Sequence, residues 1–342
     1  MLDDLKMIHE RDAQDALGGA EKAWQQLSVE TTFEPAFVPS NDILNVVYCG
    51  LGNSALAALL SQSVVGLHVP FEVVREYDIP LYVGEKSLFI AASDSGNTEE
   101  TLEAIGKAEA QGAQIGVMAG GGTLVDIAHQ KGYPLMIMPK SNTSSHGVFN
   151  TLKALVTLLD QASLTTISTS ELVQSAEFLR VKAQDWLPTV PTASNLAKQI
   201  AQECMGKSIV VYSGPKLAAA AYAWKTGFNR NAKQLAWCGQ YPEFNHNEFA
   251  GWSKQPVNKP YAVIDIRSSF EHERVCRRFE VSERLLSGMR PKPIIVQAEG
   301  DTLLEQLLWV INFGDFVTLY TALLNGLNPA NADLEEKFNK EL

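Results

Sequence analysis

Residues 87–101 read SLFIAASDSGNTEET, and this stretch decides the fold. Residues 87–92 form a short apolar run, which is typical of a strand that is buried on both faces. The polar residues that follow break the strand, and residues 99–111 then show a helical pattern. A strand that passes through a Ser/Gly loop into a helix is the first half of a βαβ unit. The stretch therefore predicts a parallel sheet covered by helices.

The same alternation recurs along the chain. It predicts strands at 43–49, 70–74, 114–118 and 134–138, with helices at 55–63 and 123–131 between them. After a helical pattern at 147–186, it restarts with strands at 208–212, 261–265 and 293–297 and helices at 216–229, 270–286 and 303–324. We therefore predict an α/β protein with two domains of one class, each a parallel sheet flanked by helices in three layers.

The predicted boundaries follow from prolines and from changes in pattern. Residues 1–40 are predicted to be an N-terminal helical segment, in which Leu5, His9, Ala13 and Leu17 share one face. The first domain is predicted to span 41–187. The second is predicted to span 193–342, including C-terminal helices. Two prolines make residues 188–192 the linker.

Composition excludes several classes of protein. The formal net charge of the 342 residues is -11, which disfavours binding to nucleic acid or to an anionic membrane. The first residues lack a signal-peptide pattern and no apolar run approaches about 18 residues, so we expect a cytoplasmic protein. The four cysteines have no metal-binding spacing and are predicted to be reduced, packed thiols: Cys49, Cys204, Cys238 and Cys276.

Two loops of the first domain follow predicted strands and enter helices, which is where ligands bind in open α/β sheets. A single serine there would be an ordinary helix cap. A cluster of hydroxyls beside glycines and a helix N-terminus instead predicts a phosphate site without lysine. The residues that carry this prediction are Gly50, Gly52 and Ser54 in one loop and Ser93, Ser95 and Thr98 in the other. Residues 213–215, Ser-Gly-Pro, lack such a cluster, so we expect one phosphate site per chain.

These loops resemble a known domain. Residues 50–55, GLGNSA, and 93–101 are similar to the sugar isomerase (SIS) domain, from whose usual Ser-Tyr-Ser-Gly-Asn-Thr-Glu-Glu-Thr this chain departs only at Asp94. Residues 242–248, PEFNHNE, followed by Gly251 and Trp252, resemble the signature of the bifunctional phosphoglucose/phosphomannose isomerases. Further residues that fit that family are Arg267, Glu271, Arg274, Arg278 and the GLNP of 326–329.

The resemblance implies two SIS domains in a homodimer, with no metal or organic cofactor. It implies reversible conversion of glucose 6-phosphate or mannose 6-phosphate to fructose 6-phosphate, a step of central carbohydrate metabolism. Ser54, Ser93, Ser95 and Thr98 would hold the phosphate beside Gly52. His246 would help to open the sugar ring, in its own subunit or in the neighbouring one.

The chain departs from the family at the positions of the residues that move the proton between C1 and C2 of the sugar. The family's glutamate base lies in Asn-Glu-Asn-x-Lys, but residues 229–233 read NRNAK, which places Arg230 at the base position. Arginine stays protonated and cannot act as a general base. The family's Pro-Arg pair falls near Ser145, and its C-terminal lysine falls at 338 or 339, between Lys337 and Lys340.

These departures leave alternatives open. Glu243 or Glu248 could replace the lost base, or could orient His246 and its loop. His146 could partly replace the missing arginine, and Arg230 could lie on the surface or bind an anionic group. The function is accordingly either an aldose–ketose isomerase with rearranged catalytic groups or an SIS protein that binds or senses a sugar phosphate.

Overall fold

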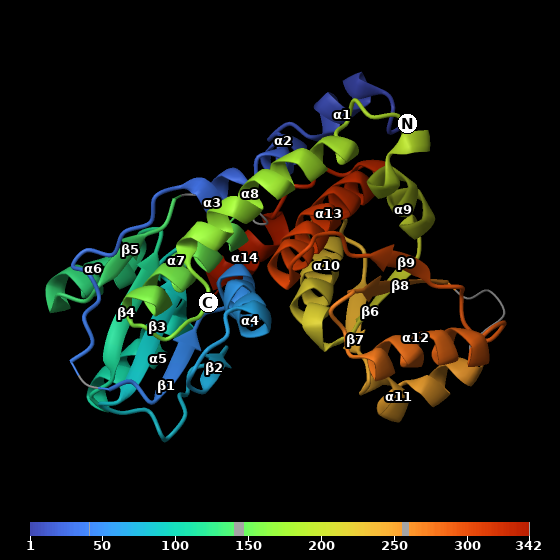
Figure 1. The fold of residues 1–342 in the computed structure, drawn as a ribbon. Coiled ribbons are helices and arrows are strands. Elements are labelled where there is room, and N and C mark those ends of the chain that lie inside the picture. Colours follow the sequence, from blue (N-terminus) through green and yellow to red (C-terminus); the bar gives the residue numbers. More distant parts are fainter. Residues whose placement is uncertain (41, 140–146, 255–259, 342) are drawn as a thin grey trace. The chain divides into compact units, whose positions relative to one another are not determined.

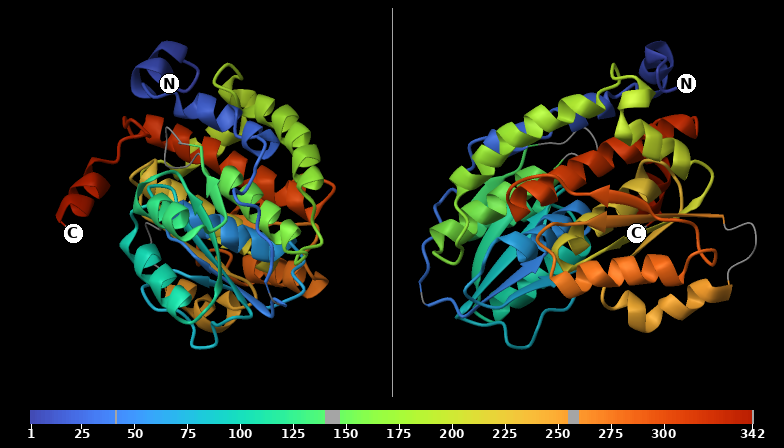
Figure 2. Two further views of the ribbon diagram at one scale, coloured as in Figure 1. Left: turned by 90° about the vertical axis from the view of Figure 1, so that its left-hand side faces the viewer. Right: turned by 45° about the vertical axis from the view of Figure 1, so that its right-hand side comes forward.

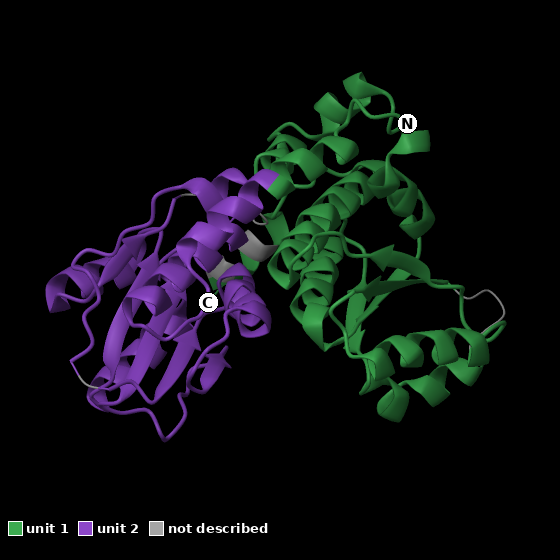
Figure 3. Ribbon diagram, in the orientation of Figure 1, with its two compact units in different colours: residues 1–22, 178–342 green, residues 23–177 purple. Residues whose placement is uncertain are grey.

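The computed structural model describes residues 1–40, 42–139, 147–254 and 260–341. The chain divides into two compact units (Figure 3): unit 1 comprises residues 1–22 and 178–342, and unit 2 comprises residues 23–177. Each unit is built on one parallel sheet with helices on both faces (Figure 1), which confirms the predicted α/β class.

Unit 2 has a five-stranded parallel sheet in the order β2-β1-β3-β4-β5. Its central strand, β3, is buried along its whole length, as the apolar run of 87–92 predicts. The predicted strands lie within two residues of their observed bounds. The elements of unit 2 are α3 (Gln25–Ser28), β1 (Asn45–Cys49), α4 (Gly52–Val64), β2 (Phe71–Val74), β3 (Ser87–Ser93), α5 (Glu99–Ala110), β4 (Gln114–Ala119), α6 (Gly122–Lys131), β5 (Leu135–Ile137), α7 (Val148–Gln161) and the first part of α8 (Thr169–Ala183).

Alternate residues of each unit 2 strand face opposite helix layers, since side chains change face at every residue of a strand. Val47, Phe89 and Val117 pack in one buried cluster with Ala104 of α5 and Leu124 of α6. On the other face the helices are α4 and α7, which pack against each other. There a Cβ at Gly116 of β4 would lie 2.8 Å from Leu158 of α7, so α7 rests directly on the sheet.

Unit 1 has a four-stranded parallel sheet in the order β7-β6-β8-β9. Strand β7 escapes prediction because it is a short edge strand in which Trp237 and Cys238 are exposed. The elements of unit 1 are α1 (Leu5–Arg11), α2 (Ala16–Glu21), the end of α8, η1 (Gln184–Trp186), η2 (Thr192–Ser194), α9 (Leu196–Cys204), β6 (Ser208–Ser213), η3 (Pro215–Leu217), α10 (Ala218–Arg230), β7 (Ala236–Gln240), α11 (Phe244–Asn247), η4 (Phe249–Lys254), β8 (Tyr261–Arg267), α12 (Glu273–Leu285), β9 (Ile294–Gln297), α13 (Leu303–Leu324) and α14 (Asp333–Glu341).

The two faces of the unit 1 sheet are covered differently. An aromatic cluster fixes α11, η4 and α12 on one face, where Tyr212 and Val263 pack with Phe244, Trp252 and Phe279. On the other face, α10 packs on α13, as the views of Figure 2 show. The indole N–H of Trp224 donates to the Val310 carbonyl oxygen at 2.8 Å and ties these two helices together.

The ends of the units differ from the predicted boundaries of 1–40, 41–187 and 193–342. The first 22 residues group with unit 1, and the change of unit falls at 177/178, inside α8 rather than at the proline linker. The linker is bound within unit 1, because the Lys198 ammonium donates to the carbonyl oxygens of Pro188 and Val190, each at 2.8 Å. The predicted apolar face at the N-terminus is interrupted, since Asp12 ends α1 and accepts from the first N–H groups of α2.

Helix α13 is long and apolar enough to cross a membrane by length and composition, but 89% of its apolar window is buried inside the protein. It is the core helix of unit 1. The prediction of four packed thiols is correct for Cys49 and Cys204, which are buried, and wrong for Cys238 and Cys276, which are exposed on the edge strand β7 and on α12.

Candidate functional site

The loop after β3 gathers three hydroxyl side chains. The Ser93 Oγ lies 2.8 Å from the Thr98 Oγ1 and 3.4 Å from the Ser95 Oγ. Ser93 is buried at the end of the strand, whereas Ser95 is exposed and Thr98 is half-buried at the start of α5. Because the first N–H groups of a helix lack intrahelical partners, an anion at these hydroxyls would also meet the positive end of α5.

Hydrogen bonds from backbone N–H groups of the loop to its own hydroxyls fix its conformation. The Gly96 N–H donates to the Ser93 Oγ at 3.0 Å, and the Asn97 N–H donates to the Ser95 Oγ at 3.2 Å. Gly96 has a φ of +69°, a conformation that favours glycine. Sequence spacing identifies these hydroxyls correctly as neighbours, since the loop turns back within five residues.

A second loop, after β4, supports the first one. A Cβ at Gly96 would lie only 1.6 Å from the Gly121 carbonyl oxygen, so the two loops touch through their backbones. The Asn97 Oδ1 accepts from both the N–H and the hydroxyl of Thr123, each at 3.0 Å. The sequence alone indicates no such role for Asn97 or Thr123. The glycine run at 120–122 after a predicted strand was the signal for this close approach.

The loop after β1 lies beside the phosphate loop, as expected for neighbouring parallel strands. A Cβ at Gly50 would lie 2.9 Å from the Ala92 carbonyl oxygen and 3.2 Å from the Ser54 Cβ. Gly52 has a φ of +56° where α4 begins, and the buried Ser54 lies in the first turn. The Tyr48 hydroxyl donates to the Ser54 carbonyl oxygen at 2.8 Å, which fixes this turn against β1.

Asp94 is the single departure of the phosphate loop from the SIS pattern. Its carbonyl oxygen accepts from the Gly120 N–H at 3.2 Å, a backbone contact that any residue type could make. Partial burial raises the pKa of the Asp94 carboxyl. A carboxylate in this position would repel a bound phosphate, so its chemistry differs from that of the usual tyrosine.

The PEFNHNE stretch forms the short helix α11, and three of its residues anchor it. The Phe244 ring is buried against Tyr212, with ring centroids 4.6 Å apart. The Asn245 side chain donates to the Ser282 hydroxyl at 3.0 Å and accepts from the Arg278 guanidinium at 3.1 Å, which ties α11 to α12. A third anchor is Glu248, whose carboxylate accepts from the Tyr212 hydroxyl at 2.7 Å.

The anchors leave Glu243 and His246 on the surface. Both residues are exposed, and the Glu243 carboxylate accepts from the Asn247 amide at 3.2 Å. Within the part of the chain that the structure describes, the His246 ring has no hydrogen-bond or ion-pair partner. Of the two glutamates considered as a base, Glu248 is therefore occupied in holding the fold, whereas Glu243 is presented with His246.

Arg230 is the last residue of α10 and is half-buried. A cation is favourable at the C-terminus of a helix, which is a sufficient structural reason for its charge. The turn that follows is ordered, because the Lys233 ammonium bonds to the Arg230 carbonyl oxygen and Asn231 donates to the Thr318 hydroxyl at 3.0 Å.

The corresponding turn of unit 1 is filled by a carboxylate of the protein. After β6, the Lys216 N–H donates to the Glu271 Oε1 at 2.8 Å, and a Cβ at Gly214 would lie 2.3 Å from the same oxygen. Burial raises the pKa of Glu271. A side chain thus occupies the place that an anion at this turn would need.

The structure gives no site contacts for the remaining residues that the sequence suggests. Ser145 and His146 lie outside the described residues, and so does the side chain of Lys340. Lys337 is exposed on α14. Among the residues that the structure describes, no group of three or more His, Cys, Asp or Glu side chains could hold a metal ion.

Comparison with known proteins places these features in context. Residues 193–342 match the family model of the bacterial phospho-glucose isomerase C-terminal SIS domain. A bifunctional phosphoglucose/phosphomannose isomerase from Aquifex aeolicus (strain VF5) is 27% identical over 300 residues, covering 87% of this chain and 90% of that protein. A D-glucosamine-6-phosphate 4-epimerase from Sulfolobus acidocaldarius is 30% identical over 220 residues, covering 64% of this chain and 67% of that protein.

The fold has a counterpart among solved structures. A glucose-6-phosphate isomerase like protein from Thermus thermophilus superimposes with a TM-score of 0.67 at 19% identity, over 100% of this chain and 99% of that one. At this identity the likeness establishes the fold alone, along the whole chain.

Proposed function

The chain belongs to the bifunctional phosphoglucose/phosphomannose isomerase family, and we propose that it interconverts glucose 6-phosphate or mannose 6-phosphate with fructose 6-phosphate. The observation that supports this most is the hydroxyl cluster of Ser93, Ser95 and Thr98 at the start of α5. It suits the dianionic phosphate that these sugars share, because hydroxyls and helix N–H groups together make an anion site.

At the phosphate end, Ser54 adds a fourth hydroxyl from the neighbouring loop. The close approach of Gly50 to Ala92 sets that loop against the end of β3, and Gly52 lets α4 begin there. Because both loops are held by backbone contacts, little conformational freedom is lost on binding. Preorganisation of this kind favours tight recognition of the phosphate.

At the sugar end, we assign the chemistry to the exposed residues of α11 and to Arg230. His246 would donate or accept a proton to open the ring, and the Glu243 carboxylate would carry the proton between C1 and C2. Arg230 remains cationic, so its role would be to balance the negative charge of the enediolate rather than to act as the base.

We further propose that the protein acts in the cytoplasm as a homodimer. The resemblance to the family supports this assignment. Light scattering coupled to size-exclusion chromatography measures the oligomeric state directly, and a monomeric mass at micromolar concentration would contradict the dimer.

Turnover of fructose 6-phosphate tests the function. Purified protein is supplied with fructose 6-phosphate, and the formation of glucose 6-phosphate is followed through a coupled dehydrogenase, with mannose 6-phosphate measured in parallel. We expect turnover that falls by about 10²-fold or more in His246→Ala and is unchanged in His129→Ala, an exposed histidine of α6. Equal activity of the two variants would remove His246 from the mechanism.

A broader panel of sugar phosphates tests which sugar the protein converts. Glucosamine 6-phosphate is included, because one relative is named for a reaction of that sugar. We expect it to compete for the phosphate loop without being isomerised. Conversion of glucosamine 6-phosphate in the absence of any fructose 6-phosphate turnover would replace the isomerase assignment with a different sugar-phosphate reaction.

A further inference from the structure

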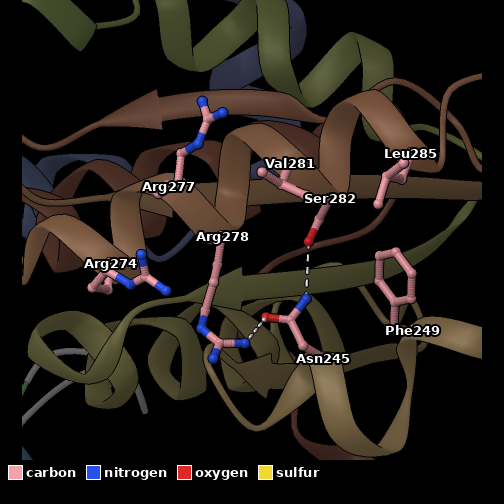
Figure 4. Close-up of a pocket in the computed structure, with 8 residues that line it drawn as sticks. All are labelled: Asn245, Phe249, Arg274, Arg277, Arg278, Val281, Ser282 and Leu285. Atoms are coloured by element: carbon pink, nitrogen blue, oxygen red, sulfur yellow. Dashed lines mark hydrogen bonds between the residues drawn. The ribbon is translucent and has the colours of Figure 1, made fainter.

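A groove on the surface of unit 1 is not used by the proposed function. It lies between α12 on one side and α11 with η4 on the other and has a volume of ≈ 390 Å³ (Figure 4). This volume falls in the range of small-molecule sites, about 300–1,000 Å³. Neither His246 nor Glu243 lines it, so the groove and the residues assigned to isomerisation can be tested separately.

One end of the groove carries two arginines in successive turns of α12. Arg274 and Arg278 are four residues apart and therefore lie side by side on the helix. Neither has an acidic partner within ion-pair distance among the described residues, whereas Arg277 on the same helix pairs with Glu280 at 2.7 Å. Arg278 is fixed in place by its bond to the Asn245 Oδ1 at 3.1 Å, and Asn245 is fixed in turn by Ser282.

This pair is unusual in its setting. The protein has a net charge of -11, and the sequence of α12 itself contains several glutamates. Like charges four residues apart destabilise a helix. No acidic side chain among the described residues lies within ion-pair distance of this pair. Two forked cations without acidic partners, one of them preorganised by an amide, suit a phosphate oxygen cluster.

The other end of the groove is apolar. Figure 4 shows Phe249 and Leu285 together at the end away from Arg274. The Phe249 ring is braced by the buried Phe244, with ring centroids 5.9 Å apart, so one wall of this end is rigid and aromatic. Leu285 is 53% exposed and supplies the opposite wall. A flat apolar group fits between such walls by stacking on the ring.

We propose that this groove binds a small organic anion of the nucleoside monophosphate type. Its phosphate would lie against Arg274 and Arg278, and its ring would lie between Phe249 and Leu285. The juxtaposition of two arginines without acidic partners and a half-buried aromatic wall in one groove carries the assignment. The site is distinct from the hydroxyl cluster of Ser93, Ser95 and Thr98, which belongs to unit 2.

Calorimetric titration of the full-length protein with adenosine 5′-monophosphate at low ionic strength tests the proposal. We expect binding at one site per chain that weakens at least about tenfold in Arg274→Ala/Arg278→Ala, since each arginine contributes a charged hydrogen bond. Leu285→Ala should weaken it to a smaller degree. Arg284→Ala, an exposed arginine at the end of the same helix, is the matched control and should bind as the natural protein does.

Two fragments of the nucleotide test the two ends of the groove, and the affinity for fructose 6-phosphate is measured as a control. Inorganic phosphate and adenosine should each bind more weakly than the nucleotide, and an equal affinity of either fragment would overturn the two-ended site. Undetectable binding of the nucleotide, or undiminished binding by the double variant, would overturn the proposal altogether. Fructose 6-phosphate affinity should be unchanged in the double variant, so failure here leaves the isomerase assignment standing. Displacement of the nucleotide by an acidic peptide of higher affinity would reassign the groove to a protein partner.

Discussion

Arg230 is the residue at which this chain departs most from its family. We expect Arg230→Gln to lower kcat by about 10²-fold, because a fixed cation near a developing enediolate contributes several kcal/mol. Arg230→Lys should keep part of the activity, since it retains the charge. Arg230→Glu should be the least active of the three. The variants are compared by initial rates with fructose 6-phosphate, with Arg284→Gln as the control.

Arg230→Glu also separates two accounts of this position. If the variant is more active than the natural protein, the site requires a carboxylate base there, and Arg230 is a lost base rather than a working cation. A glutamate at a helix C-terminus costs about 0.3–1 kcal/mol through the helix dipole. The thermal stability of each variant is therefore measured before its rate is interpreted.

Asp315 is a partly buried carboxyl of α13 with no hydrogen-bond or ion-pair partner among the described residues. Burial raises its pKa from 3.8 to about 8. Between these two values the unfolded chain loses the proton while the folded protein keeps it, so this group makes the free energy of unfolding fall as pH rises from about 4 to about 8.

Asp315→Asn removes this titration. We expect the variant to gain stability relative to the natural protein as pH rises, by at least about 1 kcal/mol between pH 5 and pH 8, since one pKa unit corresponds to about 1.4 kcal/mol. Urea denaturation at both pH values measures the difference. Asp301→Asn, at an exposed position, should show no such trend, and a trend of equal size there would contradict the assignment.

At the level of elements, the phosphate loop depends on backbone contact with the loop after β4. Gly96→Ala would place a Cβ 1.6 Å from the Gly121 carbonyl oxygen, at a φ of +69°, so the two loops would have to separate. We expect weaker fructose 6-phosphate binding and a loss of about 1–3 kcal/mol in the free energy of unfolding.

Gly106→Ala is the matched control in the same region. Gly106 lies inside α5, and a Cβ there would meet nothing within 4 Å. Because alanine is the better helix former, this change should stabilise the protein by up to about 1 kcal/mol and leave binding intact. Equal losses in the two variants, measured by urea denaturation and calorimetry, would contradict the special role of Gly96.

Elements with strong apolar runs were predictable from the sequence. The run of 87–92 became the central strand, and the 303–324 pattern became α13 with the predicted bounds. Strand β7 is not predictable from an apolar run, because an exposed edge strand needs little apolar character. The N-terminal helix was predicted as one stripe, but the Asp12 side chain caps α2 and separates it from α1.

Of the candidate site, only the parts fixed by local sequence can be predicted. Hydroxyl spacing identified Ser93, Ser95 and Thr98, because local sequence fixes a short loop. The division of the PEFNHNE motif into anchors and exposed residues could not be predicted. It depends on distant partners, Ser282 for Asn245 and Tyr212 for Glu248, which only the folded chain brings into contact.

At the level of the whole molecule, the two units share an architecture but differ at the turn where an anion would bind. Unit 2 offers hydroxyls after its central strand, whereas unit 1 fills the turn after β6 with the Glu271 carboxylate. Two sheets of one class need not carry the same function. The hydroxyl cluster of the proposed phosphate site accordingly lies in unit 2.

The proposed function requires that the bound sugar phosphate is isomerised through an enediolate and not merely held. The most direct measurement is the incorporation of deuterium into fructose 6-phosphate incubated with the protein in heavy water, followed by NMR at C1. We predict incorporation together with formation of an aldose 6-phosphate, and the loss of both in Ser95→Ala/Thr98→Ala. Tight binding of fructose 6-phosphate without deuterium incorporation and without an aldose product would contradict the claim.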